Sequence, residues 1–371
     1  VVPALASALV LVFVLASEMF SIPGLLGRPA GYTNLAYQIF RSVRVSPPEW
    51  PLAAASGTLL MWIAVVGMYV YQRITRVASR YVTVTGKGYR PRLLAVGRLR
   101  WALVALNLVY IALAVILPFG ALLLGSFMKY KTARGLSWDL FTLENYAFLS
   151  QELVRRALIN TLILSLTVPT LVVVLAVTLS YIVLRTRLPL RTWIDSLATL
   201  PVAIPGIVFG IGLLWAYFPI PLPIYGTVAI LAIGYWGRYL PQAIRTTSAS
   251  LIQVDAALEE SARVHGASAV ATLRRITVPL LRPAMAYAWL FTFILISREV
   301  SMAIVLYRTE SVTISTLIWD LLEGGQSPMT AYALGVLQSA IIFGLAIVAR
   351  ALLRVDLLRR RSAASPSMMG G

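Results

Sequence analysis

The chain has 371 residues, of which 59% are hydrophobic and only 12% are charged. A soluble domain of this length could not bury so much apolar surface, so the composition predicts an integral membrane protein. The absence of cysteine excludes disulfide frameworks, thiolate metal sites and cysteine nucleophiles. The net charge of +18 is explained by where the charges lie along the chain, and we do not expect nucleic-acid binding.

Eight apolar runs have lengths close to the ~20 residues that cross a bilayer core. Such runs predict helices, because a helix satisfies its own backbone hydrogen bonds in lipid. They also lack the alternation of polar and apolar residues that marks a β-barrel strand. We therefore expect an all-α, polytopic helical bundle with eight transmembrane helices. The predicted spans are 3–22, 51–71, 101–127, 157–184, 194–217, 224–242, 284–305 and 330–352.

The segments that connect these spans differ sharply in charge. Sixteen basic residues and one acidic residue lie in 73–100, 185–192 and 350–361. Ten basic and nine acidic residues lie in the alternate segments 18–49, 129–156 and 298–329. The positive-inside rule places the first set in the cytoplasm. We therefore expect a multi-pass protein of a bacterial or archaeal cytoplasmic membrane, with the C-terminus and the loop 243–282 on the cytoplasmic side.

The sequence repeats itself at an offset of 280 residues. Residues 3–28 align without a gap on residues 283–308 with ten identities, among them Arg28 and Arg308. Apolar composition alone does not easily place Pro, Ser and Arg in one register, so the match predicts a duplicated unit. Both copies have the same predicted orientation. A parallel repeat of this kind argues against an ion-coupled secondary transporter, for which inverted repeats are favoured.

The repeat predicts the domain organisation. Residues 1–72 form the last two spans of a first half, and residues 101–353 form a complete second half of six spans. Residues 73–100 are a basic cytoplasmic linker, and residues 354–371 are a basic cytoplasmic tail. Val1 corresponds to Leu281 in this register, so we expect that a preceding part of the protein carries the other spans of the first half. The run at 1–20 has no charged n-region and is not expected to be a signal peptide.

The loop between the predicted sixth and seventh spans is amphipathic. Asp255 is a suitable N-cap for a short helix, and Gly266 is suited to end it in the left-handed conformation. A second helix follows, and Pro279 is expected to block its continuation into the next span. His265, the single histidine, is expected to be a surface or packing residue. The pattern predicts helix, turn and helix at the membrane surface.

This loop resembles the coupling loop of permease subunits in binding-protein-dependent ABC importers. The family's signature is Glu-Ala-Ala, three residues, Gly, nine residues, Ile, any residue, Leu-Pro. Two conservative departures occur here, Ser261 for Ala and Val278 for Leu. The matching positions are Glu260, Ser261, Ala262, Gly266, Ile276, Val278 and Pro279. The stretches LPVAIPG (200–206), SREVSMAIVLY (297–307) and VTVTGKGYRPR (82–92) extend the resemblance to the fused two-half permeases of ferric iron and thiamine importers.

The resemblance implies the fold of an ABC type I importer permease, here two plus six spans of an expected pair of six-span halves. It also implies that the chain is not an enzyme and binds no cofactor of its own, because ATP and Mg would be bound by a separate ATPase dimer. The stretch TGKG (85–88) lacks the other residues of a P-loop. An extracytoplasmic solute-binding protein and the lipid bilayer are the other implied partners.

The resemblance also implies roles for the loop residues. Glu260 would pair with a polar or basic group in a groove of the ATPase, and Ser261 and Ala262 would permit close approach. Gly266 would supply the turn, and Pro279 would fix the exit into the membrane. Ile276 belongs to the same matched signature.

A substrate path is predicted from ionisable residues at the ends of two equivalent spans. Glu18, Arg298 and Glu299 are such residues, and hard oxygen ligands suit a hard cation such as Fe(III). Charges at an outer helix end are the alternative interpretation. Pro205 and Gly206 lie in a run of helix breakers that indicates either a discontinuous helix lining a path or close helix packing through Gly206 and Gly210.

No His/Cys/Asp/Glu set has metal-site spacing, and no catalytic set is present. The function predicted is that of a permease subunit of an ATP-driven importer, with ferric iron as the first choice of cargo. Thiamine, a polyamine, a phosphonate or another small solute remains open as the cargo of the same machinery. An ion-coupled secondary transporter is the alternative of a different class.

Overall fold

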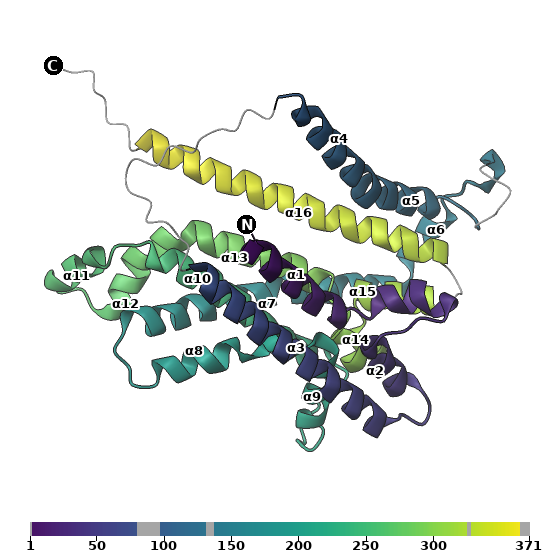
Figure 1. The fold of residues 1–371 in the computed structure, drawn as a ribbon, viewed down its shortest axis with the longest axis horizontal. Helices are drawn as coiled ribbons and strands as arrows, with labels where there is room; N and C mark the ends of the chain where they lie inside the picture. Colours follow the sequence, from purple (N-terminus) through teal and green to yellow (C-terminus); the bar gives the residue numbers. More distant parts are fainter. Residues whose placement is uncertain (1, 80–96, 131–136, 325–327, 364–371) are drawn as a thin grey trace.

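The computed structural model describes residues 2–79, 97–130, 137–324 and 328–363, and it is built from helices (Figure 1). Within these residues the backbone forms no strand beyond an isolated antiparallel bridge between Met128 and Phe141. The helices longer than eight residues are α1 (Val2–Glu18), α2 (Leu35–Arg44), α3 (Trp50–Ser79), α4 (Leu99–Ile111), α5 (Leu117–Ser126), α7 (Glu152–Arg185), α8 (Arg191–Thr199), α9 (Gly206–Tyr217), α10 (Val228–Ile252), α11 (Ala256–Val264), α13 (Val278–Ser297), α15 (Ile314–Glu323) and α16 (Pro328–Ala363). Three single-turn helices complete the set: α6 (Glu144–Ala147), α12 (Ala269–Thr272) and α14 (Ala303–Leu306).

The expected eight spans are not confirmed. In the described part of the chain, five helices are long and apolar enough to cross a membrane, namely Trp50–Thr75, Leu99–Ser126, Glu152–Arg185, Ala269–Ser297 and Pro328–Val348. Two further helix pairs satisfy the same test only together, and each pair is sharply bent. The bend is 66° between Leu5–Glu18 and Pro23–Ala30, and 115° between Arg191–Ala203 and Gly206–Tyr217. The predicted sixth span falls in α10, whose apolar sequence is interrupted by Arg238, Gln242 and Arg245.

The centre of the molecule is formed by α7, α10 and α13, which pack against one another (Figure 1). Val172 of α7, Leu231 of α10 and Ala288 of α13 are fully buried between them. Small hydroxyl side chains let α7 and α10 approach closely, and the Ser180 Oγ lies 2.8 Å from the Thr247 Oγ1. Small and weakly polar contacts of this kind are typical of helix packing inside a bilayer.

Two stretches of the chain show the same order of elements. A long helix, a short irregular stretch, a ten-residue helix and another long helix follow one another in α1–α2–α3 and in α13–α15–α16. The ten-residue helices α2 and α15 are each capped by a polar side chain: Asn34 accepts a hydrogen bond from the Tyr37 N–H, and Thr313 accepts one from the Thr316 N–H. This order has the 280-residue register of the sequence repeat. The division of the chain into two halves stays a prediction.

The basic linker and tail are only partly described. Helix α3 continues to Ser79, so the first residues of the predicted linker 73–100 belong to this helix. Helix α16 likewise continues to Ala363, into the predicted tail. The stretch 82–92, with TGKG, and the end of the tail at 364–371 lie outside the described residues.

The third predicted span is present as α4 and α5, which continue into each other through one π-helical stretch, Ala112–Ile116. This segment stands apart from the central helices beside α16 (Figure 1). Its large apolar side chains, such as Leu106 and Ile116, are mostly exposed. An apolar helix with so little protein around it requires lipid as its surroundings, which agrees with a multi-pass membrane protein.

Candidate functional site

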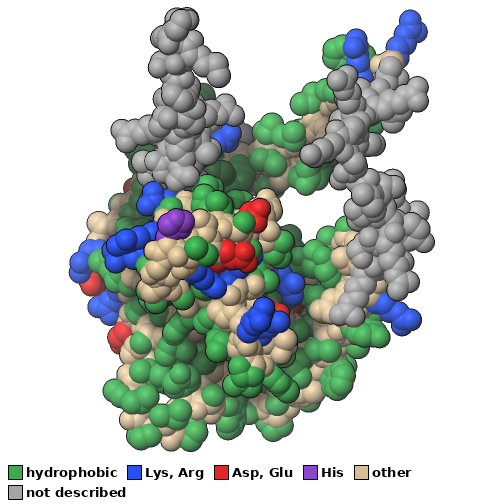
Figure 2. Space-filling view, turned by 90° about the vertical axis from the view of Figure 1, so that its left-hand side faces the viewer, with side chains coloured by type: hydrophobic (Ala, Val, Ile, Leu, Met, Phe, Trp, Pro, Cys, Tyr) green, Lys and Arg blue, Asp and Glu red, His purple; other side chains and the backbone are tan. Residues whose placement is uncertain are grey.

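The predicted surface loop has the helix–turn–helix form that its sequence indicates. The Asp255 Oδ1 accepts a hydrogen bond of 3.0 Å from the Ala257 N–H and caps α11. Gly266 follows α11 with a φ of 85°, a conformation that side chains with a Cβ rarely adopt. The Ser268 Oγ then caps α12 by accepting a hydrogen bond from the Ala271 N–H. The end of the molecule that carries α11 and α12 shows a concentration of basic side chains beside the single histidine (Figure 2).

Pro279 does not end the second helix, contrary to the sequence prediction. Residues Ala269–Ser297 form one continuous candidate span. A π-helical turn, Leu273–Thr277, directly precedes Pro279, and the proline takes the second position of α13. At the first turn of a helix the missing N–H of proline is tolerated, so the chain passes from the loop into the membrane without a break.

The residues matched to the coupling signature lie where a partner could reach them. Glu260, Ser261 and Gly266 are exposed, whereas Ala262, Ile276 and Pro279 are half-buried. His265 is exposed, and its Nδ1 lies 2.8 Å from the Ser261 carbonyl oxygen, as expected for a surface residue. The roles given to these residues by the resemblance stay predictions.

Glu259, which sequence reasoning missed, is the buried acid of this loop, with only 2% of its surface exposed. Its carboxylate accepts a hydrogen bond of 2.9 Å from the Thr277 Oγ1 and lies 3.5 Å from the Arg185 Nε. The Arg185 Nη2 donates to the carbonyl oxygens of Leu251 and Val254 at 2.9 and 2.5 Å. One carboxylate and one guanidinium therefore tie the ends of α7 and α10 to α11 and to the start of α13.

A second bond fastens α11 to α7. The Arg263 Nη2 donates a hydrogen bond of 3.1 Å to the Tyr181 hydroxyl. This hydrogen bond raises the pKa of the Arg263 guanidinium above its ordinary value. The loop is thus held to the central helices on two sides.

A second charged cluster lies among the central helices, where α1 and α13 end beside the middle of α10. Glu18 ends α1, Glu299 follows the end of α13, and Arg238 is the eleventh residue of α10, about 16 Å along that helix. The Arg238 Nη2 lies 3.4 Å from the Glu18 Oε2, and the Arg238 Nε lies 3.9 Å from the Glu299 Oε2. The three side chains are 14%, 8% and 18% exposed for Glu18, Glu299 and Arg238, so the cluster is largely shielded from solvent.

Uncharged groups complete the surroundings of this cluster. The Tyr239 hydroxyl donates a hydrogen bond to Glu299 Oε2, and the Met302 N–H donates one to Glu299 Oε1 at 2.9 Å. The Arg238 Nη1 donates to the Ile204 carbonyl oxygen at 3.1 Å. The Ile204 carbonyl lies at the 115° break between α8 and α9, so the bent pair contributes its irregular backbone to the charged groups.

Gly206 opens α9 beside the same groups. A Cβ at this position would lie 2.8 Å from the Arg238 Cζ, which is closer than real contacts permit. The helix is therefore discontinuous at Pro205 and Gly206, as one sequence interpretation predicted. Gly206 also permits close packing, but its neighbour is the Arg238 side chain and not another helix backbone. Gly210 approaches the backbone of Met302 in a similar way.

The structure brings together four of the five residues predicted for a substrate path: Glu18, Glu299, Pro205 and Gly206. The fifth, Arg298, is exposed and does not join the cluster. Its place beside the two acids is taken by Arg238, which sequence reasoning missed. The signal was available, because Arg238 is an ionisable residue inside a predicted span.

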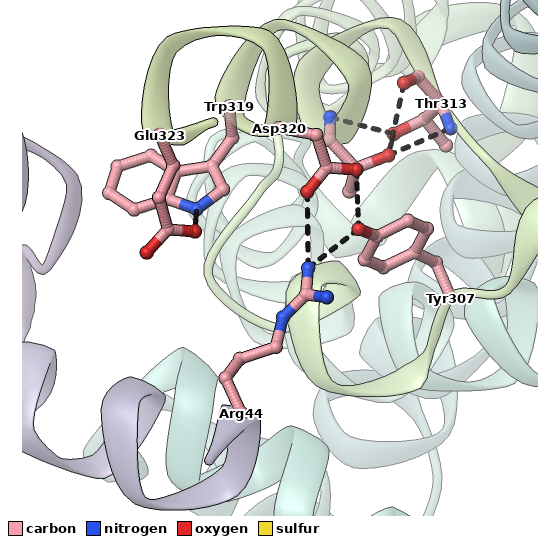
Figure 3. A network of polar contacts seen from close by, with 7 residues as sticks. Arg44, Tyr307, Thr313, Trp319, Asp320 and Glu323 are labelled. Carbon is pink, nitrogen blue, oxygen red and sulfur yellow. Dashed lines mark hydrogen bonds and ion pairs between the residues drawn. The ribbon is translucent and has the colours of Figure 1, made fainter. Parts of the chain in front are cut away.

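A third polar network joins α2 to the segment after α13 (Figure 3). The Arg44 Nη2 donates to the Tyr307 hydroxyl at 2.6 Å and to the Asp320 Oδ1 at 3.1 Å. The Tyr307 hydroxyl in turn donates to the Asp320 Oδ2 at 2.5 Å. Burial and the neighbouring Asp320 carboxylate raise the pKa of the Tyr307 phenol. Unlike the other two clusters, this one contains an ion pair that is substantially exposed.

Known proteins with similar sequences are permeases. The chain is 29% identical over 329 residues to the ferric transport system permease protein FbpB of Actinobacillus pleuropneumoniae, with 87% of this chain and 47% of the relative covered. It is 31% identical over 314 residues to a putative ferric transport system permease of Haemophilus influenzae, with 83% and 48% covered. The chain spans about half the length of these curated relatives. No family model matches it.

The chain is homologous to the permease proteins of ferric transport systems. Its fold agrees with this relationship. A chain of the bacterial ABC transporter that imports the polysaccharide alginate superposes with a TM-score of 0.55 at 20% identity, covering 69% of this chain and 95% of that one. The same transporter in complex with an alginate-bound periplasmic protein gives a TM-score of 0.56 at 21% identity, covering 70% and 94%. The chain is therefore a helical membrane protein with the fold of ABC importer permeases.

Proposed function

We propose that this protein is the permease subunit of an ATP-driven importer and that its cargo is ferric iron. The observation that carries the proposal is the similarity to ferric transport permeases along more than four fifths of the chain. The coupling signature at Glu260–Pro279 and the fold of an importer permease support it. The chain forms the path through the membrane, and a separate pair of ATPase subunits binds ATP and Mg and drives the cycle.

The loop α11–α12 is the docking element for one ATPase subunit on the cytoplasmic side. Glu260 and Ser261 face outward, and α11 presents them on a short, capped helix. Glu259, Arg185 and Arg263 fasten this helix to α7, α10 and α13, so a displacement imposed on α11 is passed to the membrane helices as a rigid-body motion. An extracytoplasmic binding protein delivers the cargo to the opposite side.

Glu18 and Glu299 are the groups proposed to meet the cargo. They come from the ends of two repeat-related helices and converge at the break before α9. Carboxylate and phenol oxygens are hard ligands, and hard cations such as Fe(III) prefer them. Two acids against one arginine leave this cluster with a net negative charge, which favours a cation.

A phosphonate importer is the second candidate. A putative 2-aminoethylphosphonate permease of Salmonella typhimurium is 29% identical over 135 residues, covering 36% of this chain and 51% of the relative. This match covers a much smaller part of the chain than the matches to the ferric transport permeases do. Arg238 is the group in the central cluster that could attract an anion, but two carboxylates surround it.

The docking role is tested by co-purification with the ATPase subunit encoded beside this protein. Glu260→Arg reverses the charge of the docking face, and Gly266→Pro removes the left-handed turn, so both variants are expected to lose the ATPase. Glu310→Arg, an exposed acid outside the loop, is the matched control and retains it. Normal ATPase recovery with both loop variants would contradict the docking role.

The cargo is tested by uptake of radiolabelled iron, thiamine and 2-aminoethylphosphonate into cells that express the complete system. Accumulation of iron alone is expected. Depletion of ATP should stop it, whereas collapse of the proton gradient at constant ATP should not. Uptake that follows the proton gradient would instead indicate a secondary transporter.

A further inference from the structure

We infer that Arg238 is a built-in counter-cation that closes the path, and that a hard multivalent cation takes its place between Glu18 and Glu299 during transit. The inference rests on the proposed transport function and adds to it the group that occupies the site when no cargo is there. It assigns to Arg238 a role in gating that is separate from helix packing.

The distances show that Arg238 is shared between the two acids. Charge-assisted hydrogen bonds between guanidinium and carboxylate groups are normally ~2.7–2.9 Å long. Here the guanidinium lies 3.4 Å from Glu18 and 3.9 Å from Glu299, and its Nε has no hydrogen-bond acceptor. A guanidinium held loosely by two acids can leave either of them at a smaller cost than one in a bidentate pair.

The site also contains a hydroxyl group that makes no hydrogen bond in this structure. The Tyr235 hydroxyl is fully buried, interacts electrostatically with Glu299 and has no hydrogen-bond partner. Buried hydroxyl groups are normally paired, so the unpaired Tyr235 hydroxyl has the capacity for a further polar partner. With Glu18, Glu299 and Tyr239 it would offer a cation four oxygen-bearing side chains.

The charge of the cluster selects the class of cargo. With both acids ionised and Arg238 protonated, the cluster carries one net negative charge. A cation of charge two or three can neutralise both carboxylates, and it gains more from them than the single charge of Arg238 does. In the described residues no group of three or more His, Cys, Asp and Glu side chains could hold a metal ion, so the proposed site has two carboxylates and depends on phenol oxygens for its other ligands.

The backbone at Gly206 leaves space for the Arg238 guanidinium. Gly206 has no side chain, and any Cβ there would press on the Arg238 Cζ. The guanidinium is also held by the Ile204 carbonyl, which belongs to the same break. A change in the bend between α8 and α9 would therefore move the carbonyl that holds Arg238, which links opening of the path to helix movement.

The inference is tested by titrating Tb(III), a hard trivalent probe, into the purified full chain in phosphatidylcholine nanodiscs, with tyrosine-sensitised luminescence as the readout. Arg238→Gln removes the competing cation and is expected to bind Tb(III) at least about tenfold more tightly than the wild type. Arg238→Lys keeps a cation and should stay near the wild type. Arg298→Gln, an exposed neighbour of the cluster, is the matched control and should not change the affinity.

Adding Glu299→Gln to Arg238→Gln should abolish the gain in affinity. The variant Glu18→Gln/Glu299→Gln supplies a second test that leaves Arg238 in place, and it should lose the Tb(III) binding of the wild type. An Arg238→Gln protein that binds Tb(III) no more tightly than the wild type would overturn the inference. So would a gain that survives the loss of both acids.

The titration needs neither the ATPase nor uptake, so its failure can be distinguished from failure of the proposed function. If cells accumulate no iron through this protein, the proposed function is contradicted, and the titration still decides whether Arg238 competes with a cation for the two acids. Normal iron uptake by Arg238→Gln cells, with unchanged Tb(III) affinity, would overturn the gate and leave the function in place.

Discussion

The two buried clusters of this protein both contain glutamate and arginine and differ in how these groups are arranged. At the loop, one acid meets one base: Glu259 is bonded to Thr277, and Arg185 is fastened to two carbonyl oxygens. Among the central helices, two acids share Arg238 at 3.4 and 3.9 Å, and one carbonyl oxygen accepts a hydrogen bond from it. A base with a single acid partner and two carbonyl acceptors is fixed in one place, whereas a base shared between two acids can move from one to the other. The first arrangement, Glu259 with Arg185, suits a rigid connection between helices and is called the joint. The second, Glu18 and Glu299 with Arg238, suits a movable closure of the path and is called the gate.

The largest expected effect is on the gate. The variant Glu18→Gln/Glu299→Gln removes both carboxylates, so iron uptake should fall to the background of cells that lack the permease. The variant leaves buried Arg238 without an acid, so its amount in the membrane is measured in parallel and uptake is expressed per molecule of inserted protein. Uptake of radiolabelled iron is the measurement, and Glu310→Gln is the exposed control. Normal uptake by the double variant would show that Glu18 and Glu299 are not needed for transport and that the cluster is not a gate.

Breaking the joint is expected to lower the stability of the folded protein. Glu259→Leu leaves the Arg185 guanidinium without its acid, and breaking a buried pair of this kind costs about 3–5 kcal/mol. The melting temperature of the purified protein should fall accordingly. The variant Glu259→Leu/Arg185→Met replaces both charges with apolar groups and should recover most of the loss. If the single variant is as stable as the wild type, the pair is not a joint.

A smaller effect is expected where the backbone approaches the gate. Gly206→Ala places a methyl group against Arg238, and such overpacking costs about 1–3 kcal/mol. Gly212→Ala, on the same helix, meets open space and is the matched control. Thermal unfolding of the two variants measures the difference. Equal stability would mean that Arg238 moves aside freely, which would sharpen the description of the gate as loosely held.

The smallest effect is expected at the exposed ion pair between α2 and α15. Arg44→Gln removes its contacts with Tyr307 and Asp320, and exposed ion pairs contribute only about 0.2–1 kcal/mol. Thermal unfolding at low and high salt should show a small loss that salt reduces. A loss of stability as large as that of Glu259→Leu would show that the exposed pair and the buried pair contribute equally to stability.

Much of the loop could be predicted from the sequence. Asp255 and Gly266 act locally, one as a cap and the other as a left-handed turn, and the structure confirms both. Pro279 was misjudged because its effect depends on the preceding turn, which is π-helical here. A proline is a helix breaker only where the helix needs its N–H.

The clusters were harder to predict because they depend on distant residues. Glu18 and Glu299 were found through the repeat, but their partner Arg238 lies on a helix outside the repeated stretch 3–28 and 283–308. Glu259 and Glu260 are neighbours of the same type, and only packing against Arg185 makes one of them buried. The number of spans was not confirmed, because two predicted spans are helix pairs bent by 66° and 115°, and α10 is interrupted by Arg238, Gln242 and Arg245.

We propose that the Glu259–Arg185 joint transmits motion and that the Glu18–Arg238–Glu299 gate meets the cargo, and one measurement tests this separation most directly. ATP hydrolysis and iron transport are measured together in reconstituted complexes of the wild type, Glu18→Gln/Glu299→Gln and Glu259→Leu. The gate variant is predicted to hydrolyse ATP at a rate near that of the wild type and to transport no iron, whereas the joint variant should lose both. A gate variant that loses ATP hydrolysis together with transport, or keeps both, would contradict the separation of the two clusters.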